Sequence, residues 1–375
     1  MIAPAISSPL SRSSLKLLFV STPVGALGSG LGGGVDLTLQ NIAEALCQRG
    51  HRVQILAPTG SHLTGSAAEI PIIPVAGALQ PMAQTESRES PILLPKNSVL
   101  AHCWDQARQI EQDYDLILNF AYDWLPFYLS SFLQRPVAHL VSMGSLLDAI
   151  DQIIEQTLDR YPNTIAMHSR AQAETFRFGD RCHLLGNGLD LSLYQPLYHL
   201  PSDAQPYLAW VGRIAPEKGI EDAIAAAQAS GLFLRIWGAM PDQDYWHTIC
   251  TRYPNGGFRY EGFCSTQQLQ QGLRQAQALL MTPKWIEAFG NVAIEALACG
   301  LPVLAYRRGG PAEIVESGQT GWLVKPDSVE DLVAAIAQIE QIDRRICRQQ
   351  AETRFSMQAM GERVEAWFAE ILASC

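Results

Sequence analysis

Cysteine pairs, clustered cations and long apolar runs are all missing, and each gap excludes a class of protein. The eight cysteines stand singly, with no CxxC pair and no cysteine–histidine grouping at zinc spacing, so neither a disulfide framework nor a metal site is expected. Nowhere do about eighteen apolar residues follow one another, which argues against an integral membrane segment. The opening residues also lack the apolar run of a signal peptide. We therefore expect a cytoplasmic protein, and contact with a membrane surface stays open.

Lysine and arginine are too few to predict a nucleic-acid-binding surface. They number 27 against 37 acidic residues, and the formal net charge is -10. The sequence is instead rich in hydrophobic residues, at 47%, with 17% charged residues, which is typical of a well-buried globular protein. Because 375 residues exceed what one ordinary core holds, we expect two domains.

The first half alternates strands and helices in the manner of a doubly wound α/β domain. A buried strand leads into a glycine-rich loop and then into a helix whose apolar residues recur at helical spacing from Val35 to Leu46. The strands are expected at 16–20, 52–56, 116–119, 137–141 and 164–168. We assign residues 1–195 to an N-terminal Rossmann-like domain, in which the proline- and serine-containing stretch 78–98 is a long loop.

A proline-bearing connector at 196–206 separates this domain from a second α/β run. Strands are expected there at 207–211, 233–237, 278–281 and 302–306. We assign 206–356 to a C-terminal domain. The chain ends in an amphipathic helix, and residues 357–375 are candidates for packing back on the N-terminal domain.

Three segments could carry chemistry, and the first is the glycine run at 32–34, which lies between a strand and a helix. Without side chains, this backbone can approach a ligand closely and point N–H groups at it, although a plain flexible turn is an equal alternative. The run is not a dinucleotide fingerprint, because the second strand ends in Ala57 and Pro58 where an acidic residue would be needed.

The second segment follows the strand at 207–211 and contains Arg213 and Lys218. Parallel sheets place ligand sites in such loops, so we favour a diphosphate site over two solvated surface charges. The third segment runs from Glu287 to Glu295, where a strand ends and a helix opens near Gly290 with free N–H groups for an anion. One carboxylate could reach a sugar hydroxyl and the other a ribose, although two ordinary helix-face glutamates would have the same spacing.

With these segments the chain resembles the family-4 retaining glycosyltransferases of the GT-B fold over nearly its whole length. The motifs that carry the resemblance occur in family order: Gly32-Gly33-Gly34, Asn187-Gly188-Leu189-Asp190, Gly212-Arg213, Glu217-Lys218-Gly219, Glu287 to Glu295, and Gly309-Gly310-Pro311-Ala312-Glu313. The resemblance implies a metal-independent enzyme without a cofactor that takes a small-molecule sugar-nucleotide donor and a small-molecule acceptor. It makes Arg213 and Lys218 the diphosphate ligands, Glu295 the ribose ligand and Glu287 the ligand of the donor sugar, with Arg213, Lys218 and Glu287 as the catalytic candidates.

The resemblance also implies that backbone amides serve the sugar and the distal phosphate, while the glycine loop closes over them. These amides belong to Phe289, Gly290, Asn291 and Val292, and the glycines that close the loop are Gly33 and Gly34. One departure concerns the family's histidine after the strand at 137–141, because that place falls on Ser142 here. His139 lies three residues earlier and is expected to be a packed core histidine.

The segments 19–43, 285–300 and 306–315 are also similar to those of cyanobacterial UDP-glucose:tetrahydrobiopterin glucosyltransferases. This narrower resemblance implies a flat, polar heterocycle as the acceptor. The residues expected to line its pocket are Asn119, Tyr122, Asp123 and Trp124, with Ser142 as a further acceptor-side candidate; a surface loop with one buried tryptophan is the alternative.

Other activities stay open. A lipid or sugar acceptor, a sugar-nucleotide epimerase and a non-catalytic sugar-nucleotide sensor all fit the two-domain architecture. An NAD-linked oxidoreductase fits the fold class but not the missing fingerprint. No heptad or apolar stripe indicates an oligomer, so the oligomeric state stays undetermined.

Overall fold

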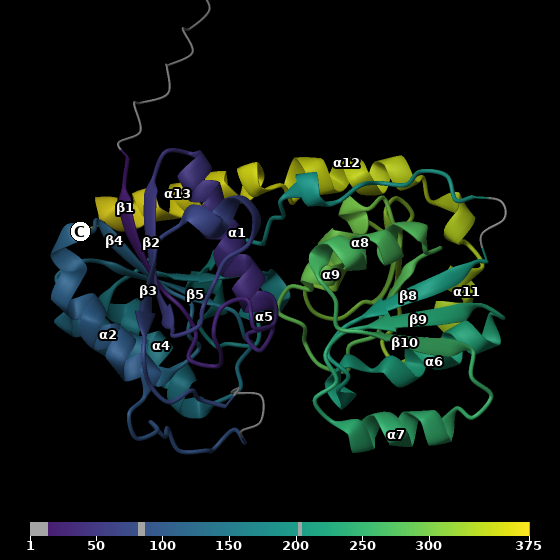
Figure 1. The fold of residues 1–375 in the computed structure, drawn as a ribbon, viewed down its shortest axis with the longest axis horizontal. Coiled ribbons are helices and arrows are strands. Elements are labelled where there is room, and N and C mark those ends of the chain that lie inside the picture. Colours follow the sequence, from purple (N-terminus) through teal and green to yellow (C-terminus); the bar gives the residue numbers. More distant parts are fainter. Residues whose placement is uncertain (1–13, 82–86, 202–204, 375) are drawn as a thin grey trace, which may run out of the picture.

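Two α/β domains lie side by side in the computed structural model, which describes residues 14–81, 87–201 and 205–374 (Figure 1). Parts of the expected N-terminal domain, of the long loop and of the connector at 196–206 therefore lie outside the described residues. Each domain has one parallel sheet with helices on both faces, and this confirms the doubly wound GT-B architecture that the sequence predicts.

The N-terminal sheet has the strand order β3-β2-β1-β4-β5-β6-β7. Its strands are β1 (Lys16–Val20), β2 (Arg52–Pro58), β3 (Ile72–Val75), β4 (Leu116–Asn119), β5 (Val137–Val141), β6 (Ile165–Met167) and β7 (His183–Leu184). Its helices are α1 (Gly34–Gln48), α2 (Val99–Ile110), α3 (Trp124–Leu129), α4 (Asp148–Arg160) and α5 (Arg170–Ala173). The order reverses between β1 and β4, and the ligand cleft of such sheets opens at that point.

The C-terminal sheet has the order β10-β9-β8-β11-β12-β13. Its strands are β8 (Tyr207–Val211), β9 (Phe233–Trp237), β10 (Phe258–Gly262), β11 (Leu279–Met281), β12 (Val303–Tyr306) and β13 (Gly321–Val324). The helices of the second half of the chain are α6 (Ile220–Ala229), α7 (Gln243–Arg252), α8 (Thr266–Gln275), α9 (Asn291–Ala298), α10 (Pro311–Ile314), α11 (Val329–Ile336), α12 (Arg344–Arg354) and α13 (Met357–Ala373). Here the order reverses between β8 and β11.

Alternation along the central strands explains why helices cover both faces of a sheet. In β1, Leu17 and Phe19 pack in one cluster with α1 and α13, whereas Leu18 and Val20 pack in another with α2. All four side chains are fully buried, because successive residues of a strand point to opposite faces. This double burial is what the uninterrupted apolar run at 17–20 indicates.

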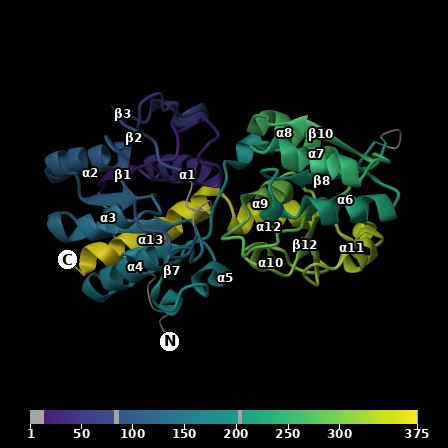
Figure 2. The same ribbon diagram turned by 90° about the horizontal axis from the view of Figure 1, so that it is seen from below.

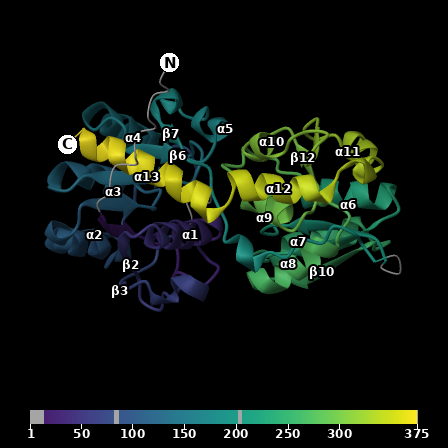
Figure 3. The same ribbon diagram turned by 90° about the horizontal axis from the view of Figure 1, so that it is seen from above.

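The chain returns to the N-terminal domain at its end. Helix α12 lies on the C-terminal domain and α13 on the N-terminal one, as Figure 2 and Figure 3 show. In α13, Trp367 and Phe368 join the cluster that contains Leu39 and Ile42 of α1, and the Trp367 indole donates to the Asn163 carbonyl at 2.6 Å. The last helix therefore ties the two domains together.

The sequence analysis did not predict four of the strands, and all four lie at the edges of the sheets: β3, β7, β10 and β13. Each lacks the fully buried pattern of a central strand. In β3 a proline interrupts the run, and every residue of β10 is partly or fully exposed. Edge strands pair on one side only, so their sequences carry a weaker apolar signal.

Candidate active site

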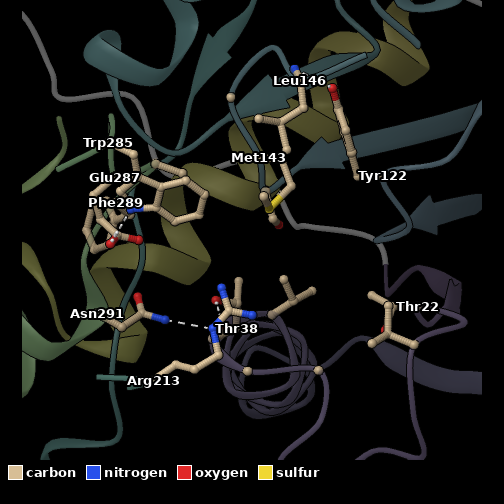
Figure 4. A pocket seen from close by; sticks show the side chains of 18 of the residues that line it. Thr22, Thr38, Tyr122, Met143, Leu146, Arg213, Trp285, Glu287, Phe289 and Asn291 are labelled. Atoms are coloured by element: carbon tan, nitrogen blue, oxygen red, sulfur yellow. Dashed lines mark hydrogen bonds between the residues drawn. The ribbon is translucent and has the colours of Figure 1, made fainter. Parts of the chain in front are cut away.

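A cleft of about 1170 Å³ lies between the domains and is lined from both of them (Figure 4). The residues that follow β1, β4, β5 and β6 line one wall, and those that follow β8, β9 and β11 line the other. Parallel sheets place ligand sites beyond the carboxyl ends of their strands, and here two such edges meet. The cleft exceeds the roughly 300–1,000 Å³ of ordinary small-molecule sites, so it has room for two substrates.

Arg213 lies just beyond β8 in the cleft lining, and its guanidinium pairs with Glu217. Gly212 and Gly238 let the ends of β8 and β9 come together, since a methyl group at Gly238 would overlap the Gly212 carbonyl. The loop then makes a short 3-10 turn at Pro216–Lys218 and ends at Gly219, which has φ +63. This turn brings the Lys218 side chain back over the cleft.

Lys218 reaches the loop between β11 and α9. Its ammonium pairs with the Glu287 carboxylate and lies 5.0 Å from the centre of the Trp285 ring. The Trp285 indole donates to the same carboxylate at 3.2 Å. Glu217 and Glu287 thus pair with the two cations, and an incoming diphosphate would share these cations with them.

Helix α9 begins at Asn291. The first N–H groups of a helix have no carbonyl one turn earlier to bond to, and here no side chain caps them. Gly290 precedes it at φ +92, a conformation that other residues rarely adopt. Beneath the loop, the Gly310 N–H donates to the Glu287 carbonyl at 2.7 Å. The expected amide donors, from Phe289 to Val292, therefore lie at the positive end of a helix, where an anion is favoured.

Glu295 lies in the second turn of α9 and lines the cleft, although only 6% of it is exposed. The Tyr194 hydroxyl donates to it at 2.9 Å. Burial raises the pKa of Glu295 to about 7, and the Tyr194 bond only partly offsets that rise. Glu287 lies in the loop before the helix and Glu295 within it, so the alternative of two glutamates on one helix face does not hold.

Gly33 and Gly34 enter the cleft from the N-terminal domain, as the sequence predicts. The Asn291 amide donates to the Gly34 carbonyl at 3.3 Å, and Asn187 donates to Asn291 at 2.6 Å. Asp36, which the sequence analysis missed, lies under the same loop. Burial raises the pKa of Asp36 to about 6, against the lowering effect of the nearby Gly32 and Gly28 N–H groups, although neither contact has good hydrogen-bond geometry.

The acceptor-side candidates divide into two groups. Tyr122, Asp123 and Ser142 line the cleft. Asn119 does not, and its assignment to the acceptor pocket is wrong: it is 1% exposed, exchanges hydrogen bonds with the Ala121 backbone and faces His139. Trp124 also lies outside the lining, where it stacks on Tyr128 with 4.5 Å between ring centres.

His139 is the core histidine that the sequence predicts. It is fully buried, its ring stacks on Phe127, and Ser130 lies at hydrogen-bond distance from it, 2.9 Å. Burial lowers the pKa of His139 to about 3. The sequence analysis missed a second histidine, His168, which follows β6 and does line the cleft.

The two walls of the cleft are fastened to each other around β6 and α5. The Ser169 hydroxyl donates to the Ala288 carbonyl at 2.6 Å. The Glu313 carboxylate accepts the N–H groups of Arg170 and Ala171 at 3.0 and 2.6 Å. These contacts hold the loop at 287–290 at a fixed place opposite the N-terminal domain.

Among the residues that the structure describes, no group of three or more His, Cys, Asp or Glu side chains could hold a metal ion. The sequence does contain two Asp-x-Asp triplets, 113–115 and 242–244, but neither lines the cleft. Within the same residues, no helix is both long and apolar enough to span a bilayer.

Residues 199–354 match the family model of glycosyl transferases group 1. Over 162 residues the chain is 32% identical to glycogen synthase of Mycobacterium tuberculosis, which is 42% of this chain and 39% of that protein. It is 28% identical over 224 residues to D-inositol 3-phosphate glycosyltransferase of Mycolicibacterium smegmatis, which is 55% and 49% of the two chains. The chain thus spans less than half the length of these curated relatives.

Solved structures agree over almost the whole chain. HepE of Anabaena, in complex with UDP and glucose, superposes with a TM-score of 0.72 at 22% identity, over 96% of this chain and 100% of that one. Sucrose-phosphate synthase from Thermosynechococcus elongatus superposes with a TM-score of 0.75 at 19% identity, over 96% and 100%. By sequence, residues 199–354 match the model of the glycosyl transferases group 1 family, and by fold the chain is of the GT-B type.

Proposed function

We propose that the protein is a retaining hexosyltransferase that moves glucose from UDP-glucose to a small hydroxylated acceptor, and that a pterin of the tetrahydrobiopterin type is the first acceptor to test. The observation that carries the proposal is the meeting of Arg213, Lys218 and the N-terminus of α9 in one cleft. These three sources of positive charge suit a leaving diphosphate. No metal is needed to supply that charge.

The donor fits the C-terminal wall in one direction. The diphosphate lies against Arg213, Lys218 and the amides before α9, the ribose hydroxyls reach Glu295, and the sugar lies beside Glu287. HepE, whose structure contains UDP and glucose, shares the fold and supports UDP as the nucleotide. Each hydroxyl bonded to a carboxylate contributes about 1.5–3 kcal/mol, which orients the anomeric carbon towards the other domain.

The reaction breaks the bond between the anomeric carbon and the diphosphate oxygen and forms one from that carbon to the acceptor oxygen. The acceptor hydroxyl attacks on the face that the nucleotide leaves, so its proton passes to the departing diphosphate and the configuration is retained. Arg213 and Lys218 stabilise the negative charge that grows on the diphosphate. Glu287 pairs with Lys218, so the carboxylate that lies beside the sugar also contacts the cation that stabilises the diphosphate.

The N-terminal wall has features that favour a flat heterocycle as the acceptor. Tyr122 and Met143 offer ring and thioether surface to the cleft (Figure 4). Beside them Asp123 is half-buried, and burial raises its pKa in spite of bonds from Leu125 and Gln80. A partly buried carboxyl group of this kind suits the N–H edge of a pyrimidine-like ring.

A second acceptor class is favoured by the rim of the cleft. Six large apolar side chains that line it are also exposed: Leu31, Leu79, Leu93, Leu94, Phe263 and Ile286. Exposed apolar side chains in such a group mark contact surfaces. An acceptor with a lipid tail would cover them, so a polyprenyl or glycolipid acceptor belongs in the same screen.

The first test is a thermal-shift panel of UDP, GDP and ADP sugars in EDTA. A ligand at about a hundred times its dissociation constant stabilises by about 2.7 kcal/mol, which is several degrees. We expect UDP-glucose to raise the melting temperature of the wild type but to act weakly on Lys218→Ala. Lys284→Ala is the matched control, because Lys284 pairs with Asp222 and Asp327 outside the cleft lining.

A panel in which no sugar nucleotide stabilises the wild type would refute the donor site. Acceptors are then screened with the sugar nucleotide that binds, and the products are identified. A new glycoside with retained configuration is expected. Conversion of the donor without any glycoside would indicate an epimerase, and binding without nucleotide release would indicate a sensor.

A further inference from the structure

The chain crosses between the two domains twice, and each crossing is only a few residues long. Leu185 packs in the main cluster of the N-terminal domain, whereas Leu189 packs in a cluster of the C-terminal domain. The return is shorter still, because Phe355 packs in the C-terminal cluster and Met357 in the N-terminal one. In Figure 3 this second crossing lies where α12 is followed by α13. A change in the angle between the domains must therefore bend the backbone at these two places.

The two crossings lie side by side. Leu189 and Ser356 form a short parallel bridge. The Leu189 N–H donates to the Phe355 carbonyl at 2.8 Å, and its carbonyl accepts the Met357 N–H at 3.0 Å. Gly188 allows this approach, since a methyl group there would lie 2.6 Å from the Ser356 carbonyl oxygen. Residues 186–189 and 355–357 thus form a paired hinge, and it contains most of the Asn-Gly-Leu-Asp motif at 187–190, which has no role in the proposed reaction.

Arg363 of α13 binds both halves of this hinge. On the first crossing, its Nε donates to the Leu185 carbonyl at 2.6 Å and its Nη2 to the Asn187 carbonyl at 3.3 Å. At the start of the second crossing, its Nη1 donates to the Arg354 carbonyl at 3.2 Å. The side chain is half-buried, and burial lowers the pKa of Arg363, although an arginine keeps its charge at physiological pH in any case. One rigid, charged group therefore fixes the backbone of both crossings.

The hinge also touches the cleft. The Asn187 side chain donates to the Asn291 side chain at 2.6 Å, and Asn291 in turn donates to the Gly34 carbonyl at 3.3 Å. Asn291 is the first residue of α9 and Gly34 the first of α1, and both line the cleft from opposite domains. The backbone that Arg363 holds is therefore connected by hydrogen bonds to both walls of the site.

We propose that Arg363 is a positioning residue that holds the two crossings in the arrangement in which the walls of the cleft face each other. Without its three bonds each crossing can bend independently, and the domains spread over a wider range of angles. Only a fraction of these arrangements brings both walls to the donor, so the apparent affinity falls by that fraction. The effect on UDP-glucose rests on the proposed function, whereas the arrangement of the free domains does not.

The test combines small-angle X-ray scattering with titration calorimetry of UDP-glucose in EDTA. The radius of gyration of free Arg363→Ala should exceed that of the wild type by about 1 Å, roughly a twentieth of the value for a compact chain of this length. Saturating UDP-glucose should bring both proteins to the same radius. The affinity of the variant for UDP-glucose should be about three- to tenfold lower, because only about a third to a tenth of its molecules are ready to bind. Arg363→Lys, which keeps the charge and a donor, should recover part of both losses.

Arg344→Ala is the matched control. Arg344 of α12 is also half-buried, and it donates to the carbonyls of Ala276 and Arg274 at 2.9 and 2.6 Å, but all of these residues belong to the C-terminal domain. This variant loses the same kind of bond, so its melting temperature should fall while its scattering and its UDP-glucose affinity equal those of the wild type. If Arg363→Ala does not fold, Arg363→Gln, which removes the charge and the fork, takes its place with the same expectations.

An unchanged radius of gyration in free Arg363→Ala would overturn the inference. An equal increase in Arg344→Ala would also overturn it, because the effect would then be a general loss of stability. A larger radius without any loss of UDP-glucose affinity would remove the link between the hinge and the donor site. A wild type that does not bind UDP-glucose would instead refute the proposed function, and the comparison of the free proteins would still decide the role of Arg363.

Discussion

Replacing Glu295 with glutamine should stabilise the protein above neutral pH while it weakens nucleotide binding. Burial raises the pKa of this carboxyl from 4.5 to about 7. Between these two values the folded state keeps a proton that the unfolded chain releases, so the free energy of unfolding falls as the pH rises through that interval. A rise from 4.5 to about 7 corresponds to about 3 kcal/mol of stability, which is lost once the pH is above 7. Glutamine has the same shape and no charge, so the variant avoids this loss.

The assay is urea denaturation of the wild type and Glu295→Gln at pH 5 and pH 8. The difference in unfolding free energy should grow by up to about 3 kcal/mol in favour of the variant between the two pH values. Because all other groups are common to both proteins, their titration cancels in this difference. The affinity for UDP should fall by about tenfold or more in the variant, since the ribose loses a charge-assisted bond.

Glu261→Gln is the control with the opposite sign. Burial raises the pKa of Glu261, but bonds from Arg235 and Arg259 outweigh that effect and leave the pKa below its usual value. Glu261 therefore contributes stability above its unfolded pKa that is lost as the pH falls, and its glutamine variant should be less stable at pH 8. A free-energy difference for Glu295→Gln that is the same at pH 5 and pH 8, or a variant less stable at pH 8, would refute the reasoning.

Three further results are expected. Lys218→Ala should lower the rate of UDP release by roughly a hundredfold or more, measured as initial rates, and a rate within a few fold of the wild type would refute its role at the diphosphate. Gly309→Ala should abolish donor binding and lower the melting temperature, since a methyl group there would lie 2.5 Å from the Glu287 nitrogen at φ +67; Gly231→Ala has the same φ with no atom within 4 Å and isolates the backbone strain. Turnover should be equal in EDTA and in added Mg²⁺, and a loss in EDTA that Mg²⁺ restores would point to a metal-dependent mechanism.

The sequence by itself determined the architecture and most of the C-terminal wall. Central strands such as β1 and β12 are buried on both faces, so their apolar runs are visible without any knowledge of their neighbours. Arg213, Lys218, Glu287 and Glu295 lie in contiguous motifs that combine a strand end, a loop and a helix start, and local backbone geometry is enough to bring such residues to one edge of a sheet.

The tertiary structure decided what depends on partners distant in the sequence. Edge strands such as β10 were missed because one side of them has no neighbour, and Asn119 was misassigned because its contacts with Ala121 and His139 follow from the packing of β4 against β5. His168 became visible only once the register of β5 and β6 placed it beside Ser142. The physical reason is the same in each case: a side chain's direction and partners follow from strand pairing, which no local pattern specifies.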